Sequence, residues 1–142
     1  MSSEPRPCRR SAAQIVFYAA ESCLYLFGGQ DENNDTLNDL WMFCLTKRRW
    51  SEVEQRGQIP PGRSGHTLNL HNNHLLLFGG ILEVTKESNS LYVFDIFAQS
   101  WFTQKSSSTD LLAPGGDQIS ASAANIPSQR DSVGDINPSM SI

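Results

Sequence analysis

The strongest constraint on the fold is a segment that occurs twice in the chain. Residues 24–50 read LYLFGGQDENNDTLNDLWMFCLTKRRW, and residues 75–101 read LLLFGGILEVTKESNSLYVFDIFAQSW. The glycine pairs and the closing tryptophans of the two copies keep one offset (79 − 28 = 101 − 50 = 51). A fixed period indicates that each copy is one supersecondary unit that buries an apolar face against its neighbour.

Each copy has the pattern of several β-strands. Residues 24–27 and 75–78 are short apolar runs ended by two glycines, which favours a strand buried on both faces over a helix. Glycine permits backbone dihedrals that other residues avoid and lets a second backbone approach closely. Residues 40–45 and 91–96 then alternate between two faces, as strands do. A polar turn leads each copy into a further strand that begins near its tryptophan.

The order of these features resembles the kelch repeat, whose period is about 50 residues. Both copies have a glycine pair, a loop, an N-[DS]-L-[WY]-x-F segment, and a tryptophan seven residues after the phenylalanine (50 − 43 = 101 − 94 = 7). Residues 59–66, IPPGRSGH, are similar to the P-x-x-R-x-x-H segment before a kelch first strand. The resemblance covers residues 10–105 and implies that each copy is a four-stranded antiparallel blade of a β-propeller. It assigns a structural role to the motif residues Gly28, Gly29, Trp41, Trp50, Arg63, His66, Gly79, Gly80, Tyr92 and Trp101.

The first copy departs from this pattern where it begins. Ala12 and Ile15 occupy the positions at which Arg63 and His66 stand one period later. Arg10-Ser11 can substitute for the missing R-x-x-H segment if the register shifts slightly. The start of the first blade is therefore the least regular part of the repeat.

We expect an all-β fold: two four-stranded antiparallel kelch blades of an incomplete β-propeller, with a disordered C-terminal tail. Residues 1–13 form a polar N-terminal arm, 14–54 the first blade, 55–64 a linker and 65–105 the second blade. Residues 106–142 contain no aromatic residue and are rich in serine, alanine, glycine, proline and aspartate. Such a tail cannot bury enough apolar surface to offset about 1–2 kcal/mol of backbone entropy per residue.

Two blades cannot close a ring, because propellers close with about 4–8 blades. An open pair has one blade–blade interface and leaves two outer faces uncovered, on which we expect Phe17, Phe27, Trp41, Phe78 and Phe94. Each large apolar side chain left in water forgoes about 1.5–3 kcal/mol. Exposed faces of this kind mark a missing partner. We expect further kelch blades of a longer chain, or self-association, to cover them.

Composition excludes several classes of function. The net charge is −4 and no basic patch is present, so neither nucleic acid nor an anionic membrane is an expected partner. No run approaches the roughly 18 apolar residues of a membrane span. Cys8, Cys23 and Cys44 are odd in number and form no C-x-x-C pair, which indicates reduced thiols in a cytoplasmic protein.

No constellation in the sequence indicates catalysis or a metal. Asp31, Asn33 and Asp35 begin like a calcium loop, but Thr36 and Met42 stand where glycine and glutamate are required. We expect no cofactor and no metal, and predict that the chain is not an enzyme.

The three histidines are not expected to form a metal site. His71 and His74 flank a hairpin turn, whereas His66 lies five residues away along its strand, about 16 Å at about 3.3 Å per residue. We interpret His66 as structural, and we expect His71 and His74 to be exposed.

Function is expected to reside in the loops, where rigid scaffolds usually bind. The loops in question are 30–38, QDENNDTLN, and 81–89, ILEVTKESN. Since kelch propellers with long loops commonly act as scaffolds, the resemblance implies a non-catalytic protein–protein interaction scaffold whose partner the sequence does not identify. The alternatives are the substrate-recognition subunit of a ubiquitin ligase and, less favoured, a fragment of a kelch-fold enzyme. The candidate partner-binding residues are Asp31, Glu32, Asp35, Glu83, Lys86 and Glu87.

Overall fold

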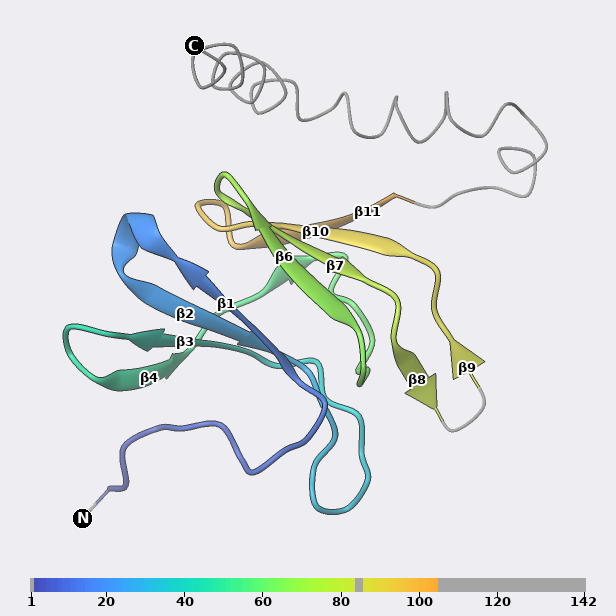
Figure 1. Ribbon diagram of the computed structural model, residues 1–142, viewed down its shortest axis with the longest axis horizontal. Coiled ribbons are helices and arrows are strands. Elements are labelled where there is room, and N and C mark those ends of the chain that lie inside the picture. The colour runs from blue at the N-terminus through green and yellow to red at the C-terminus, as the bar shows by residue number, and fades with distance from the viewer. Residues whose placement is uncertain (1, 84–85, 105–142) are drawn as a thin grey trace, which may run out of the picture. The chain divides into compact units, whose positions relative to one another are not determined.

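The computed structural model describes residues 2–83 and 86–104, which form two β-sheets side by side (Figure 1). The only helical segment in these residues is the 3-10 turn η1, Ala19–Glu21. The all-β prediction is confirmed. None of the described residues forms a helix of the length and apolarity that crossing a bilayer requires. The expected disordered tail, 106–142, lies outside the described residues.

The first sheet has four strands in the order β1-β2-β3-β4, and each neighbouring pair is antiparallel. It contains most of the first repeat copy and the strand that precedes it. The register pairs Phe27 with Leu40 and Phe43 with Trp50, so residues of one face stay together across the sheet. The strands are β1 Gln14–Tyr18, β2 Cys23–Phe27, β3 Leu40–Cys44 and β4 Arg49–Glu52.

The second sheet has five strands in the order β5-β11-β10-β7-β6. The β6–β7 turn is Asn72–Asn73, with Asn72 at a φ of 53°, a left-handed conformation that asparagine tolerates. The strands are β5 Arg56–Gly57, β6 Thr67–His71, β7 His74–Phe78, β10 Leu91–Asp95 and β11 Ser100–Gln104. A separate two-stranded hairpin, β8 Ile81–Glu83 with β9 Lys86–Glu87, leaves the end of β7.

The strand β5 comes from the segment that the sequence analysis assigned to a linker. It runs parallel to β11, and the N–H groups of Arg56 and Gln58 donate to the carbonyls of Gln99 and Trp101 at 2.9 Å each. An edge strand has unpaired backbone groups, and here the connecting segment satisfies them. Gly57 makes the close approach possible, since its φ is +76° and a β-carbon there would collide with the Trp101 carbonyl. The second blade therefore has a fifth strand at its edge.

The core lies between the two sheets. Trp101 is at its centre, with its ring centroid 5.4 Å from that of Phe27 in the first blade and 4.9 Å from that of Phe94 in its own. Figure 1 shows the sheets facing each other, with β1 beside β6. The buried cluster comprises Tyr18, Cys23, Tyr25, Phe27, Leu40, Leu68, Leu75, Leu77, Phe94, Ile96 and Trp101.

Only part of the predicted outer surface is exposed. Phe17 and Phe78 are about half exposed, as expected for sheet faces without a neighbouring blade. The expectation was wrong for Phe27 and Phe94, which are fully buried because they point into the interface between the blades. It was also wrong for Trp41, which is buried and donates its indole N–H to Asp39 at 2.7 Å.

Candidate functional site

The glycine pairs place the long loops of both blades. Gly28 and Gly29 have φ values of +68° and +99°, and the Gly29 N–H donates to the Arg63 carbonyl at 2.8 Å. A β-carbon on Gly28 would lie 2.9 Å from that carbonyl and 2.9 Å from the His66 ring, and one on Gly80 would lie 2.9 Å from the His66 β-carbon. Only glycine allows this approach. The loop of the first blade is thereby fixed against the segment that begins the second.

Arg63 is a buried cation that holds the loop of the second blade. Its guanidinium donates to the carbonyls of Gly79 at 2.9 Å and Pro61 at 3.1 Å, and to the Ser88 hydroxyl at 3.3 Å. The guanidinium carbon also lies 4.9 Å from the centre of the Tyr92 ring, a cation–π contact. Burial lowers the pKa of Arg63, and the Tyr92 phenol opposes that change. Arg63 therefore contacts the glycine pair that precedes the loop of the second blade and Ser88 near the end of that loop.

His66 is a neutral link between the two blades. Its Nε2 lies 3.0 Å from the Phe27 carbonyl, and because a carbonyl can only accept, Nε2 carries the proton. The ring packs edge-on against Phe27 with centroids 5.6 Å apart. Burial lowers the pKa of His66 to about 4, in spite of the Phe27 hydrogen bond. His66 therefore contacts the end of β2 in the first blade through both its Nε2 and its ring.

Arg10 binds the glycine pair of the first blade as Arg63 binds the glycine pair of the second. Its Nη1 donates to the Gly28 carbonyl at 3.0 Å, as Nη1 of Arg63 does to Gly79. It also makes a two-pronged ion pair with Asp39, at 2.6 Å and 2.8 Å. Burial disfavours ionisation of Asp39, but the hydrogen bonds from Arg10 and the Trp41 indole outweigh it and lower its pKa. The arm is thereby anchored to the loop.

The position of Arg10 explains the irregular start of the first copy. The offset before the first strand is two residues larger than the repeat period (63 − 10 = 53). The β1–β2 connection, 19–22, has two more residues than the Asn72–Asn73 turn, which restores the register. By the same offset Ala13 stands where His66 stands in the second blade. The sequence analysis named Arg10 but could not assign the shift.

The tryptophans that close the two repeat copies lie in different environments. Trp101 is buried and donates its indole N–H to Gln55 at 2.7 Å, which links β11 to the segment before β5. Trp50, its counterpart, is only half-buried and packs on Phe43 with centroids 5.0 Å apart. The difference follows from position, since Trp101 faces the other blade and Trp50 faces outwards.

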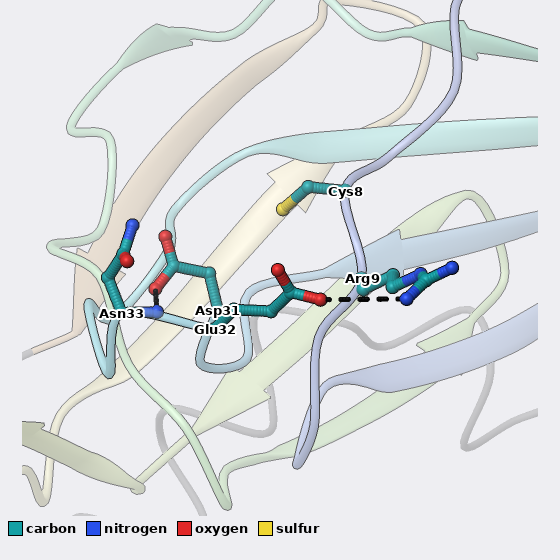
Figure 2. A pocket seen from close by; sticks show the side chains of 5 residues that line it. All are labelled: Cys8, Arg9, Asp31, Glu32 and Asn33. Carbon is teal, nitrogen blue, oxygen red and sulfur yellow. Dashed lines mark hydrogen bonds and ion pairs between the residues drawn. The ribbon is translucent and has the colours of Figure 1, made fainter.

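The acidic loop and the arm enclose a small hollow of about 300 Å³. Figure 2 shows its lining, with the thiol of Cys8 and the guanidinium of Arg9 on the arm opposite the carboxylates of Asp31 and Glu32. Arg9 and Glu32 form an exposed ion pair at 3.8 Å, and such pairs contribute little stability. Asn33 completes the lining. The hollow is open to solvent and is lined mostly by charged and polar side chains.

The acidic loop has a fixed shape. One carboxylate oxygen of Asp31 accepts the backbone N–H groups of Asn33 and Asp35, both at 2.9 Å. The Asp31 N–H donates to the Asp35 carbonyl at 3.0 Å, and the Gln30 side chain donates to the Asn34 carbonyl at 3.0 Å. Asp31 therefore builds the loop, whereas the Asp35 and Glu32 side chains are exposed, Glu32 within its solvent-exposed ion pair with Arg9.

The two candidate loops lie next to each other. The Thr36 hydroxyl donates to the Leu82 carbonyl at 3.0 Å, which joins the acidic loop to the β8–β9 hairpin. On that hairpin Glu83 pairs with Lys86, and Glu87 with Ile81. We call the acidic loop 30–38, the hairpin residues 81–83 and 86–87, and arm residues 8–9 the loop surface. Its charged side chains, mostly acidic and mostly exposed, are Arg9, Asp31, Glu32, Asp35, Glu83, Lys86 and Glu87.

His71 and His74 differ from the prediction that they are exposed. They are cross-strand partners beside the β6–β7 turn and are half-buried, because their strands pack in the sheet. His74 lies 3.7 Å from Asp95. Burial, together with His74, lowers the pKa of His71. No group of three or more potential metal ligands occurs in the part of the chain that the structure describes.

The sequence analysis did not identify Cys8, Arg9 or Asp39 as part of this region. The arm precedes the repeat and has no periodic pattern, so nothing in its sequence indicates where it lies. Asp39 could have been found, since it is the acidic residue within the N-[DS]-L motif of the first copy and a natural partner for a displaced arginine.

Two neighbouring four- to five-stranded sheets, joined face to face and tied by a buried arginine and histidine, define adjacent blades of a β-propeller. The glycine pairs that end their strands and the positions of their tryptophans indicate which family of β-propellers the blades come from. The chain belongs to the kelch-repeat family: the family model described as the KLHDC2/KLHL20/DRC7 Kelch-repeats domain matches residues 1–126.

Individual relatives agree with this assignment. A kelch repeat-containing protein of Arthroderma benhamiae is 31% identical over 105 residues, which is 69% of this chain and 15% of that protein. Dynein regulatory complex subunit 7 of Chlamydomonas reinhardtii is 32% identical over 62% of this chain and 8% of its own length. The Rho GTPase-activating protein gacHH of Dictyostelium discoideum is 31% identical over 61% of this chain and 6% of its own. The chain thus spans a small fraction of the curated relatives it matches.

Proposed function

We propose that this chain is a non-catalytic protein-interaction module that binds its partner through the loop surface. The observation that carries the proposal is the Thr36–Leu82 hydrogen bond, because it joins loops from the two blades into one contiguous surface. Kelch repeats are generally non-catalytic. One relative of this chain is named as a subunit of a dynein regulatory complex. By analogy, we propose that this chain also works within an assembly.

The chemistry of the loop surface favours a basic partner segment. Five carboxylates stand against the two cations Arg9 and Lys86. Complementary charge accelerates encounter and disfavours wrong partners, and these effects weaken as salt screens them. An extended lysine- or arginine-rich segment of a protein partner fits this surface.

The fixed shape of the acidic loop lowers the cost of binding. A loop that is already ordered loses little conformational freedom on association. The hydrogen bonds from Asp31 and Gln30 provide that order before any partner arrives. Glu32 and Asp35 are the residues we expect to meet the basic segment directly.

The test is affinity capture with the full chain, comparing two double variants of equal charge change. Glu32→Gln/Asp35→Asn removes the exposed loop carboxylates, and Glu21→Gln/Glu52→Gln removes two exposed carboxylates outside both loops. We expect the loop variant to recover at least several-fold less of the partner found with the unmodified chain, and the control variant to recover the same amount. Asp31 is left intact because it builds the loop.

Equal recovery by the loop variant and the unmodified chain would remove the loop surface from the binding site. Capture that does not weaken between low and physiological salt would contradict the basic-partner chemistry. No contact among the described residues favours the ubiquitin-ligase or enzyme alternative over this function.

A further inference from the structure

The interface between the two blades joins two unlike faces. We call the side of each sheet that carries Phe27, or its counterpart Phe78, the back face, and the opposite side the front face. The back face of the first blade packs on the front face of the second, and their side chains form one buried cluster. Strand pairing fixes each set on one side of its sheet, with Phe27 opposite Leu40 and Leu68 opposite Leu77. The back face of the first blade includes Tyr25, Phe27, Leu40 and Met42, and the front face of the second includes Leu68, Leu70, Leu77, Phe94 and Trp101.

The repeat places similar residues on the two outer faces. The back face of the second blade carries Leu76, Phe78, Leu91 and Val93, each one 51-residue period after a member of the first blade's back face. The front face of the first blade carries Ile15, Phe17, Leu26, Phe43 and Trp50, the counterparts of the second blade's front face. The two outer faces of the chain therefore carry counterparts of both halves of the interface that the two blades form with each other.

Side chains on the outer faces are far more exposed to solvent than their counterparts at the interface between the blades. Phe27 is 0% exposed, whereas its counterpart Phe78 is 48% exposed. Leu68 is 5% exposed, whereas its counterpart Ile15 is 48% exposed. Within the described residues no further blade lies on either face, so these apolar side chains meet water.

The polar contact at the edge of the interface has a counterpart as well. The Tyr18 hydroxyl donates to the Asn73 side chain of the other blade at 2.6 Å. The equivalent positions on the outer faces are His71 and Ser22, both of which can hydrogen-bond. The outer faces thus match each other in apolar and in polar positions.

We propose that a second copy of this chain docks head to tail, with the front face of its first blade on the back face of the second blade. A copy is the occupant because the front face of its first blade carries, at the equivalent repeat positions, counterparts of the residues that already fit at the internal interface. Such a contact is heterologous, so it repeats from copy to copy until a ring closes or a filament grows. Since propellers close with about 4–8 blades, a closed ring of this chain needs about two to four copies.

The test measures the mass of the full chain by light scattering, with one variant for each outer face. Phe78→Glu places a charge on the back face of the second blade, and Phe17→Glu places one on the front face of the first; both residues are about half exposed, so the fold tolerates the change. We expect the unmodified chain to have two to four times its monomer mass of 15.8 kDa, or more if filaments grow, and each variant to be a monomer. Phe97→Glu, on a highly exposed turn residue away from both faces, should leave the mass unchanged.

Mixing the two variants separates head-to-tail docking from other modes. Each variant keeps one intact face, and the two intact faces are complementary, so the mixture should form a 1:1 dimer of twice the monomer mass. Circular dichroism checks that each variant folds, and Ile15→Glu and Phe102→Glu replace any variant that does not. A monomeric unmodified chain at about 100 μM, an assembly that neither charge disrupts, or a mixture that stays monomeric would each overturn the proposal.

Discussion

Acidification should destabilise the blade pair through protonation of His66. The ring is buried between the blades, with Nε2 donating to the Phe27 carbonyl at 3.0 Å and Nδ1 without a partner in the described residues. A second proton on this ring would introduce a charge into the core, close to the buried guanidinium of Arg63. Burial accordingly lowers the pKa of His66 from 6.5 to about 4.

The sign and size of the effect follow from that difference in pKa. Because the unfolded chain binds the proton more tightly than the folded chain, the stabilisation is complete above pH 6.5 and is lost as the pH falls towards 4. At about 1.36 kcal/mol for each pKa unit, the loss reaches about 2 kcal/mol at pH 5 and about 3 kcal/mol at pH 4. The free energy of unfolding of a small domain is only about 5–15 kcal/mol in total, so a change of this size is readily measured.

The assay is urea unfolding followed by tryptophan fluorescence at pH 7.5, 6.0 and 5.0, where most carboxylates are still ionised. We compare the unmodified chain with His66→Gln, which keeps an N–H donor near Phe27 but cannot titrate. The variant should be less stable at pH 7.5 and should lose most of the pH dependence. His71→Gln is the matched control, and it should keep the larger part of the slope. If His66→Gln retained the full slope, protonation of His66 could not be its cause.

Three further predictions concern contacts that the structure identifies. Arg10→Gln should lower the free energy of unfolding by about 2 kcal/mol, as measured by urea denaturation, because it leaves a partly buried Asp39 without its cation; a change below about 0.5 kcal/mol would show that the pair contributes no more than an exposed one. Gly57→Ala should lower the melting temperature by several degrees, since positive φ costs about 1–2 kcal/mol and a β-carbon would collide with the Trp101 carbonyl; an unchanged melting temperature would mean that β5 is not needed. Leu77→Ala should cost about 2–5 kcal/mol and the equivalent Leu26→Ala clearly less, because only Leu77 is covered by the other blade; equal losses would contradict the assignment of inner and outer faces.

Several features were predictable because they depend on local pattern. Alternating side chains and glycine-ended apolar runs specify strands and their limits, and the fixed period specifies two similar sheets. The predicted hairpin at Asn72–Asn73 is observed for the same reason, since asparagine accepts the left-handed backbone that a tight turn requires.

Other features depend on contacts between distant segments, and the sequence analysis did not predict them. The salt bridge from Arg10 to Asp39 joins an arm without periodicity to a loop 29 residues away. The edge strand β5 forms only because β11 offers unpaired backbone groups to a segment with no strand pattern of its own. Phe27 was expected on an outer face, because alternation distinguishes two faces of a strand but does not say which one meets the other blade.

The sequence by itself determined the kelch family, the all-β class and the positions of most strands. Each of these depends on short-range periodicity and on glycine and asparagine residues, which accept unusual backbone conformations. The tertiary structure decided which face of each sheet is covered and which loops meet. Those choices depend on how the two sheets stack, and a two-residue change in one turn is enough to move Arg10 into the place that Arg63 occupies in the other blade.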